Sequence, residues 1–71
     1  MEFSVSIRFK KNGSFSHSED YEVEIPDKTK EDDEVDALMD AVRPILIDEF
    51  KNSKAWHNGN IDWELYDWEK I

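Results

Sequence analysis

The 71-residue sequence contains no cysteine, which excludes disulfides, thiolate metal sites and cysteine nucleophiles. With only two glycines, Gly13 and Gly59, it has no glycine-rich loop that could cradle a phosphate. Even its longest uninterrupted apolar runs, such as Ile45-Leu46-Ile47, have only three residues, whereas a helix needs about 20 apolar residues to cross a bilayer. The first residues lack a basic stretch followed by an apolar one, so we expect no secretory signal and a cytoplasmic location.

Basic residues are also scarce. The chain has 9 Lys and Arg against 18 Asp and Glu, and its formal net charge is -9. The basic residues are scattered, whereas binding to nucleic acid or to an anionic membrane requires clustered ones. We therefore expect neither direct nucleic-acid binding nor membrane binding. A negative excess favours association with a basic protein partner.

Three segments alternate between apolar and polar residues, as half-buried strands do. In residues 2–10, the apolar face carries Phe3, Val5, Ile7 and Phe9. In the second strand it carries Tyr21, Val23 and Ile25, and Pro26 ends the strand. In the third it carries Ile61, Trp63 and Leu65. The alternation slips at Leu65-Tyr66, which indicates a bulge or the end of the strand.

Asn12-Gly13 favours a two-residue hairpin between the first two strands. That register would place the two apolar faces on opposite sides of the sheet. A three-residue loop, Lys11-Asn12-Gly13, restores the match and sets Phe9 opposite Phe15 and Phe3 opposite Tyr21. A wider loop through residues 14–20 would also restore it. We predict the three-residue loop.

Apolar residues recur at helical spacing after the second strand, at Val35, Leu38, Met39, Val42, Leu46 and Phe50. Thr29 followed by Asp32 resembles a capping box, so the helix should begin near Lys30. It should end near Asn52-Ser53. Pro44 lies inside the pattern and predicts a kink, or alternatively two short helices that meet at Arg43-Pro44.

Residues 55–60 should form a loop, or a short strand and turn, with Trp56 covering the C-terminal end of the helix. The element order is ββαβ. We predict one α+β domain over residues 1–71, in which a three-stranded antiparallel sheet of order 2-1-3 packs on one amphipathic helix kinked near Pro44.

The sequence offers few groups for catalysis or metal binding. His17 with Glu19 and Asp20, and His57 with Asp62 and Glu64, have no recognised ligand spacing. Ser16-His17-Ser18 places serine and histidine on opposite faces of a strand. A single small sheet with one helix leaves little concavity to desolvate a carboxylate. We expect no enzyme activity, no metal and no cofactor.

The acidic residues of the helix form a pattern. At 100° per residue, Asp33, Asp36 and Asp40 form a stripe opposite the apolar side, in steps of about 4.5 and 6 Å along the axis. Neighbouring phosphates of one DNA strand lie roughly 6–7 Å apart. The stripe could therefore imitate a phosphate row, or it could simply be the solvated outer face that solubility requires.

The C-terminal aromatics Tyr66 and Trp68 lie among Asp62, Glu64, Asp67 and Glu69, in the manner of an interface anchor with a charged rim. Alternatively, a bulge turns Trp68 inward to complete the core.

We expect a small protein-binding module that acts on a basic partner surface, through Asp33, Asp36, Asp40, Tyr66 and Trp68. Such a module could be an inhibitor or a nucleic-acid mimic whose partner is a nucleic-acid-binding protein. The alternative is a self-associating, homodimeric structural domain that pairs through an uncovered sheet face or edge strand.

Overall fold

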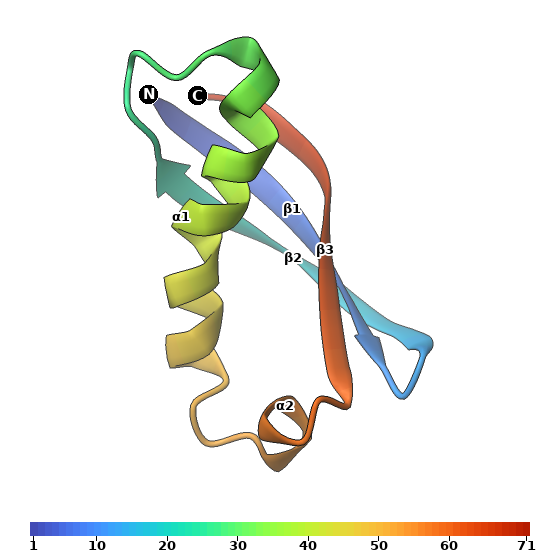
Figure 1. Cartoon of the computed structure of the whole chain (residues 1–71). Coiled ribbons are helices and arrows are strands. Elements are labelled where there is room, and N and C mark those ends of the chain that lie inside the picture. The colour runs from blue at the N-terminus through green and yellow to red at the C-terminus, as the bar shows by residue number, and fades with distance from the viewer.

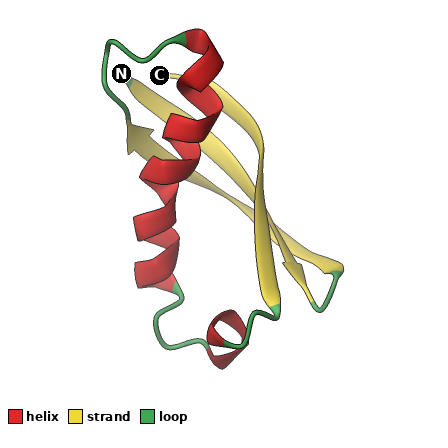
Figure 2. Cartoon of the chain, viewed as in Figure 1, coloured by secondary structure: helices red, strands yellow, loops and turns green.

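The computed structural model describes all of residues 1–71 and has an α+β fold. Its three antiparallel strands have the predicted order β2-β1-β3. One long helix, α1, packs across one face of the sheet (Figures 1 and 2). The elements in chain order are β1 (Glu2–Lys11), β2 (Ser14–Glu24), the 3-10 turn η1 (Glu31–Asp33), α1 (Glu34–Glu49), α2 (Lys54–His57) and β3 (Ile61–Lys70).

The core lies between α1 and the sheet, where the predicted alternation holds. Strand β1 contributes four side chains that are at most 3% exposed, namely Phe3, Val5, Ile7 and Phe9. Helix α1 contributes Leu38, Val42 and Leu46, which recur every fourth residue and so lie on one side of the helix. Val23 and Ile25 complete the core. No helix is both long enough and apolar enough to cross a membrane.

The hairpin between β1 and β2 differs from the prediction. Asn12 and Gly13 have φ values of 53° and 82°, which are typical of a two-residue turn with both residues left-handed. Lys11 therefore pairs with Ser14, and a bulge follows that leaves Ser16 without a partner, so that Phe9 lies opposite His17. The three-residue loop, the wider loop and the pairs Phe9–Phe15 and Phe3–Tyr21 are wrong. The bulge, not the loop, places the apolar side chains of β1 and β2 on the same face of the sheet.

The helical segment begins at Glu31, next to the predicted start at Lys30, with the 3-10 turn η1 leading directly into α1. The expected capping box is absent: the Thr29 hydroxyl donates to the carbonyl of Pro26 at 2.7 Å, and no side chain caps the start of η1 or α1. The helix ends at Glu49, short of Asn52. It continues without interruption through Pro44, so the alternative of two short helices is wrong. Pro44 is exposed, and water can satisfy the carbonyl that lacks its usual N–H partner.

Residues 54–57 form the short helix α2 where we expected a loop or a strand. The Ser53 hydroxyl accepts a hydrogen bond from the Trp56 backbone N–H at 3.3 Å and so caps the N-terminus of α2. The Trp56 ring stacks on Phe50 with centroids 5.0 Å apart, so it covers the C-terminal end of α1 as expected.

The slip in β3 is a bulge, as the sequence indicated. Ile7 pairs with Leu65 and Ser6 pairs with Asp67, which leaves Tyr66 without a partner on β1. Beyond the bulge, Trp68 lies opposite Val5. The bulge therefore exchanges the two faces of β3 over its last residues.

Candidate functional site

Helix α1 covers only one face of the sheet (Figure 1). Because successive residues of a strand point to opposite faces, the side chains of Ser4, Ser6, Arg8 and Lys10 lie on the uncovered face. No element of the chain packs on them. This face is where the structure leaves a large surface free for a partner.

The register gathers carboxylates on one end of this face. Glu22 of β2 and Glu69 of β3 both pair with Ser4, one on each side. Asp20 and Asp67 flank Ser6 in the same way, and Glu24 pairs with Glu2. We call this surface the acidic sheet face; its carboxylates are those of Glu2, Asp20, Glu22, Glu24, Asp67 and Glu69.

Every carboxylate of the acidic sheet face is exposed and none belongs to an ion pair. Asp20 accepts a hydrogen bond from the Ser6 hydroxyl at 2.6 Å, and Asp67 accepts one from the Trp68 backbone N–H at 2.9 Å. An open hollow between side chains of β1 and β2 is lined by Glu2, Glu22, Val23 and Glu24. The chain supplies no cation to this hollow.

Two positive groups adjoin residues of the acidic sheet face in the sequence, the Met1 ammonium next to Glu2 and Lys70 next to Glu69. The Met1 ammonium donates to the Asp27 carboxylate at 2.6 Å and to the Ile25 carbonyl at 2.7 Å. Its hydrogen bond and its charge lower the pKa of Asp27, and the charge of Lys70 acts in the same direction. Lys70 pairs with Phe3 and so lies on the helix-covered side of β3.

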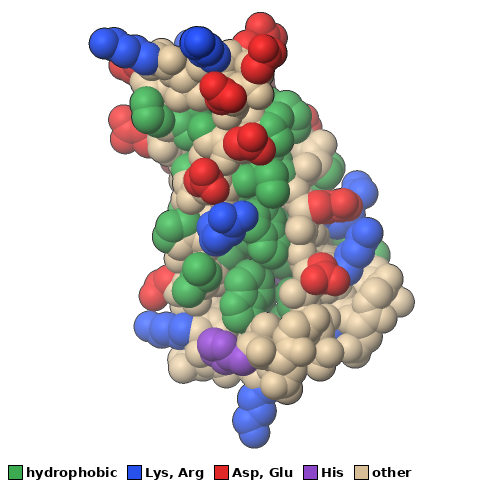
Figure 3. Space-filling model, viewed as in Figure 1, with side chains coloured by type: hydrophobic (Ala, Val, Ile, Leu, Met, Phe, Trp, Pro, Cys, Tyr) green, Lys and Arg blue, Asp and Glu red, His purple; other side chains and the backbone are tan.

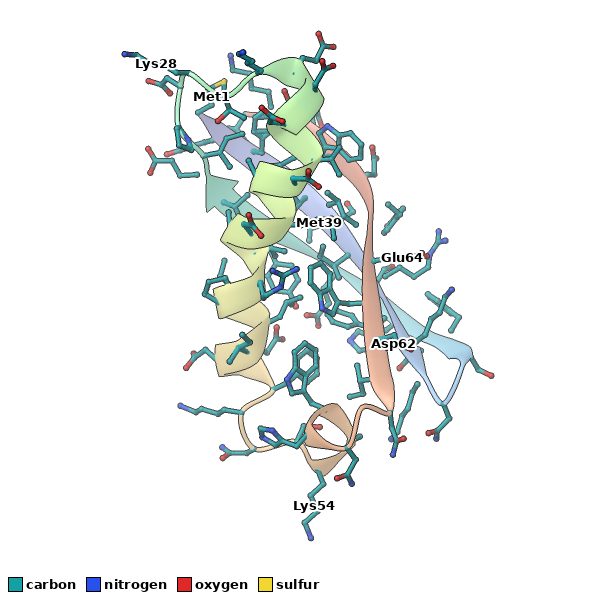
Figure 4. All side chains as sticks on the ribbon, in the orientation of Figure 1. Met1, Lys28, Met39, Lys54, Asp62 and Glu64 are labelled. Carbon is teal, nitrogen blue, oxygen red and sulfur yellow. The ribbon has the colours of Figure 1, made fainter.

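The other end of the same sheet face is electrically balanced. Arg8 donates to Glu64 at 3.3 Å and lies over the Tyr66 ring, 4.6 Å from its centroid. Lys10 pairs with Asp62. Figure 4 shows Asp62 and Glu64 along β3, with Met1 at the opposite end of the molecule. The uncovered face therefore has an acidic end and a neutral end.

The helix stripe predicted from the sequence lies on the other side of the molecule. Asp33, Asp36 and Asp40 are all exposed, and Figure 3 shows a row of acidic side chains on the outer surface of α1. Asp40 accepts from Arg43 at 3.3 Å, so part of this charge is compensated. The stripe and the acidic sheet face cannot contact one flat partner surface together.

Tyr66 and Trp68 also lie on different sides of the sheet. Tyr66 is on the uncovered face beneath Arg8 and is 43% exposed. The bulge turns Trp68 toward the helix-covered face, opposite Val5, but Trp68 is 39% exposed and is not one of the side chains packed against the core. Of the two aromatics, only Tyr66 borders the acidic sheet face.

Tyr21 joins β2 to the end of the helix. Its hydroxyl is within hydrogen-bond distance of Glu19 and Glu49, and its single proton can serve only one carboxylate at a time. Burial, then the hydrogen bonds and negative charges of Glu49 and Glu19, raise the pKa of Tyr21 far above its ordinary value.

The raised pKa predicts a loss of stability in alkali. Above about pH 10 an unfolded tyrosine ionises while folded Tyr21 keeps its proton, so ionisation lowers the free energy of the unfolded state relative to the folded one. Stability should hold below this pH and fall as pH rises beyond it. In Tyr21→Phe that fall should be smaller, as urea denaturation between neutral and alkaline pH would measure. Equal falls in both proteins would contradict the assigned contacts.

No group of three His, Asp or Glu side chains is arranged to hold a metal ion. The chain matches no known protein family, no curated protein and no solved structure. The acidic sheet face, which we did not predict from the sequence, is the feature from which a function can be argued.

Proposed function

We propose that the protein is a small acidic binding module that docks its acidic sheet face on a basic surface of a partner protein. The observation that carries the proposal is that this exposed face gathers six carboxylates, none of them ion-paired, on a sheet surface that no other part of the chain covers. As expected from the sequence, the partner is sought among cytoplasmic proteins, and no catalysis is proposed.

The arrangement is unfavourable for the isolated chain. Glu2 and Glu24 are directly opposite each other, and like charges in that position destabilise a sheet. Acidic residues that serve only solubility are normally interspersed with basic ones, as they are at Arg8 and Lys10. A basic partner would replace the repulsion among the carboxylates with attraction.

The shape of the face fits this use. Ser4 and Ser6 form a floor of small side chains between acidic walls, so long lysine and arginine side chains can reach the carboxylates from above. The hollow beside Glu2, Glu22 and Glu24 offers room for the head of one such side chain. Tyr66 adds an exposed aromatic ring at the border of the face, a residue type enriched at interfaces.

Two variants with the same net charge test the proposal. In E22Q/E24Q/E69Q the acidic sheet face loses three charges, and in D33N/D36N/D40N the helix stripe loses three. Proteins captured on the immobilised wild-type chain at moderate salt are measured for affinity to each form. We expect the sheet variant to lose at least roughly tenfold in affinity and the helix variant to stay close to wild type.

The affinities of the two variants show whether the acidic sheet face or the helix stripe binds the partner. If the sheet variant retains full affinity, the proposed site is wrong. If only the helix variant loses affinity, the stripe predicted from the sequence is the binding surface. Equal losses in both would mean that net charge alone governs capture, which also contradicts a docking site.

Self-association, the alternative from the sequence, would use the uncovered sheet face or the free edges of β2 or β3. Pairing through the uncovered face would bring the acidic sheet faces of two copies together. Antiparallel pairing of two β3 strands would bring Asp62, Glu64, Asp67 and Glu69 of one copy beside the same residues of the other. Pairing through β2 would do the same with Asp20, Glu22 and Glu24. Charged edge strands of this kind oppose edge-to-edge association, so we rank the homodimer below binding to a basic partner.

A further inference from the structure

We infer that a second copy of the chain docks on the helix-covered side of the sheet, on an apolar strip between α1 and β3. The apolar strip is lined by Val35 and Met39 of α1 and by Trp63, Leu65 and Trp68 of β3. It lies on the opposite side of the sheet from the acidic sheet face, so this inference goes beyond the proposed function. It also differs from pairing through the edges or the uncovered face, which the carboxylates there oppose.

Helix α1 covers the sheet unevenly. Its backbone comes close to β2, whereas its approach to β3 is wider. The apolar side chains of β1 beneath the helix are all buried, but no residue of β3 is. Trp63 and Leu65 are half-buried, and Trp68 is 39% exposed. Figure 3 shows hydrophobic side chains gathered in a band between α1 and β3. The β3 half of this sheet face therefore lacks a cover.

Arg43 identifies the flank of α1 that borders the strip, because its guanidinium lies 5.8 Å from the centroid of the Trp63 ring. The residues three, four, seven and eight positions before Arg43 lie on the same side of the helix, and they are Asp40, Met39, Asp36 and Val35. Val35 is 37% exposed. Met39, which Figure 4 shows on the side of α1 that faces β3, is half-buried but does not pack against the core. The strip is thus rich in Trp, Met and Arg, residue types enriched at interfaces.

The charges of this flank are complementary to those of a second copy. Asp36 and Arg43 have opposite charges and lie seven residues, or about two helical turns, apart. When two α1 helices pack antiparallel around a two-fold axis between Met39 and Asp40, each Arg43 lies beside Asp36 of the other copy. Packed helices lie about 8–10 Å apart, a distance that an arginine and an aspartate side chain span together. The same interface would therefore form two equivalent ion pairs.

Both groups are available for this pairing. Asp36 belongs to no ion pair within the chain. Arg43 directs Nη1 toward Asp40 at 3.3 Å, which leaves other N–H groups of its guanidinium free. A basic segment of another protein would meet a like charge at Arg43, whereas a second copy offers Asp36 to it. The charge pattern thus favours a second copy as the occupant of the strip.

The net charge of -9 opposes association, but much of it lies away from this interface. The acidic sheet face is on the far side of the sheet and stays on the outside of both copies. Charges separated by more than about 8 Å are largely screened at physiological ionic strength. The dimer would cover both apolar strips and present two acidic sheet faces to partners.

Two charge-reversal variants test this inference. In native mass spectrometry and sedimentation equilibrium, the wild-type chain should pass from monomer to dimer between roughly 1 µM and 1 mM. D36R makes the pair of charges on the flank wholly basic and R43D makes it wholly acidic, so each should weaken self-association at least roughly tenfold. An equimolar mixture should form a heterodimer about as tightly as the wild type pairs with itself, because opposite charges meet again.

The matched controls are D33R and K51D, which make the same two charge changes at exposed positions outside the strip. Alone or mixed, they should dimerise about as tightly as the wild type. The inference is wrong if the wild type stays monomeric at about 1 mM, or if D36R and R43D dimerise as well as it does. It is also wrong if the control variants show the same losses and the same recovery on mixing.

Met39→Glu tests the apolar part of the interface, because it places two like charges beside the two-fold axis. The dimer should be lost while circular dichroism shows that the fold is retained, since Met39 does not pack against the core. A dimer that persists in Met39→Glu would overturn the inference. Capture of a basic partner through the acidic sheet face should continue in this variant, so the proposed function and this inference can fail separately.

Discussion

Replacing Leu38 with alanine is expected to cost about 2–5 kcal/mol of unfolding free energy. The Leu38 side chain is completely buried between α1 and the sheet, and the small core offers few neighbours that could move to fill the cavity. A domain of this length is stabilised by only about 4–11 kcal/mol in total. Leu38→Ala should therefore unfold at much lower urea concentration and temperature, as circular dichroism would measure.

The matched control is Ile47→Ala in the same helix. Ile47 is 51% exposed, so its truncation removes little buried surface and should change the unfolding free energy by less than about 1 kcal/mol. Similar losses in the two variants would mean that α1 does not present its Leu38 side to the sheet. The comparison thus tests the orientation of the helix as well as the core.

The predictable part of this fold is the part that depends on long periodic patterns. The odd positions of β1 from Phe3 to Phe9 are buried as the alternation requires, and Leu38, Val42 and Leu46 are buried at helical spacing. The strand order follows from a hairpin and from a helical connection that returns the third strand to the free side of the first. Each of these predictions depends on many residues, so the local conformation of a single residue does not change it.

Local details were predicted less well because single residues decide them. Either a longer loop or a bulge can bring the apolar residues of the two hairpin strands to the same face of the sheet. The alternation of apolar residues in the sequence is the same in both cases, so it does not distinguish them. Asn12 and Gly13 tolerate left-handed conformations and select the two-residue turn, so the bulge falls at Ser16. At the helix start, Thr29 donates to the Pro26 carbonyl in place of capping the helix.

The candidate site was missed although part of its signal is present in the sequence. The predicted alternation and the order 2-1-3 already place Glu22 and Glu24 on the same sheet face as Ser4 and Ser6. The contribution of β3 depends on the bulge at Tyr66, since without it Asp67 and Glu69 would point toward the helix and Trp68 would point away. A helix stripe is visible within one short segment, whereas the acidic sheet face is built from three segments and two bulges.

Replacing Glu24 with lysine is expected to raise stability and weaken partner binding together. The substitution turns the like-charged pair Glu2–Glu24 into a pair of opposite charge, which is worth about 0.5–1 kcal/mol in a cross-strand position. For a domain of this size that corresponds to a rise in Tm of roughly 2–8 °C. The gain should shrink at high salt, because these side chains are exposed and their interaction is screened.

The mirror control is Asp62→Lys, which changes the net charge by the same amount at the neutral end of the same face. Asp62 pairs with Lys10, so this variant creates a like-charged pair and should lower Tm. Thermal unfolding would compare the two. A rise in both would show that overall charge, not the cross-strand pairs, controls stability, and a fall in both would contradict the repulsion assigned to the pair Glu2–Glu24.

The Glu24→Lys variant also tests partner binding. If the carboxylates are kept close together because a basic partner needs them, Glu24→Lys should weaken capture of that partner by at least roughly tenfold while the protein becomes more stable. Asp62→Lys should weaken capture less, because Asp62 lies outside the acidic sheet face. A stabilised Glu24→Lys protein that still binds with full affinity would show that the repulsion between Glu2 and Glu24 does not serve the proposed interaction.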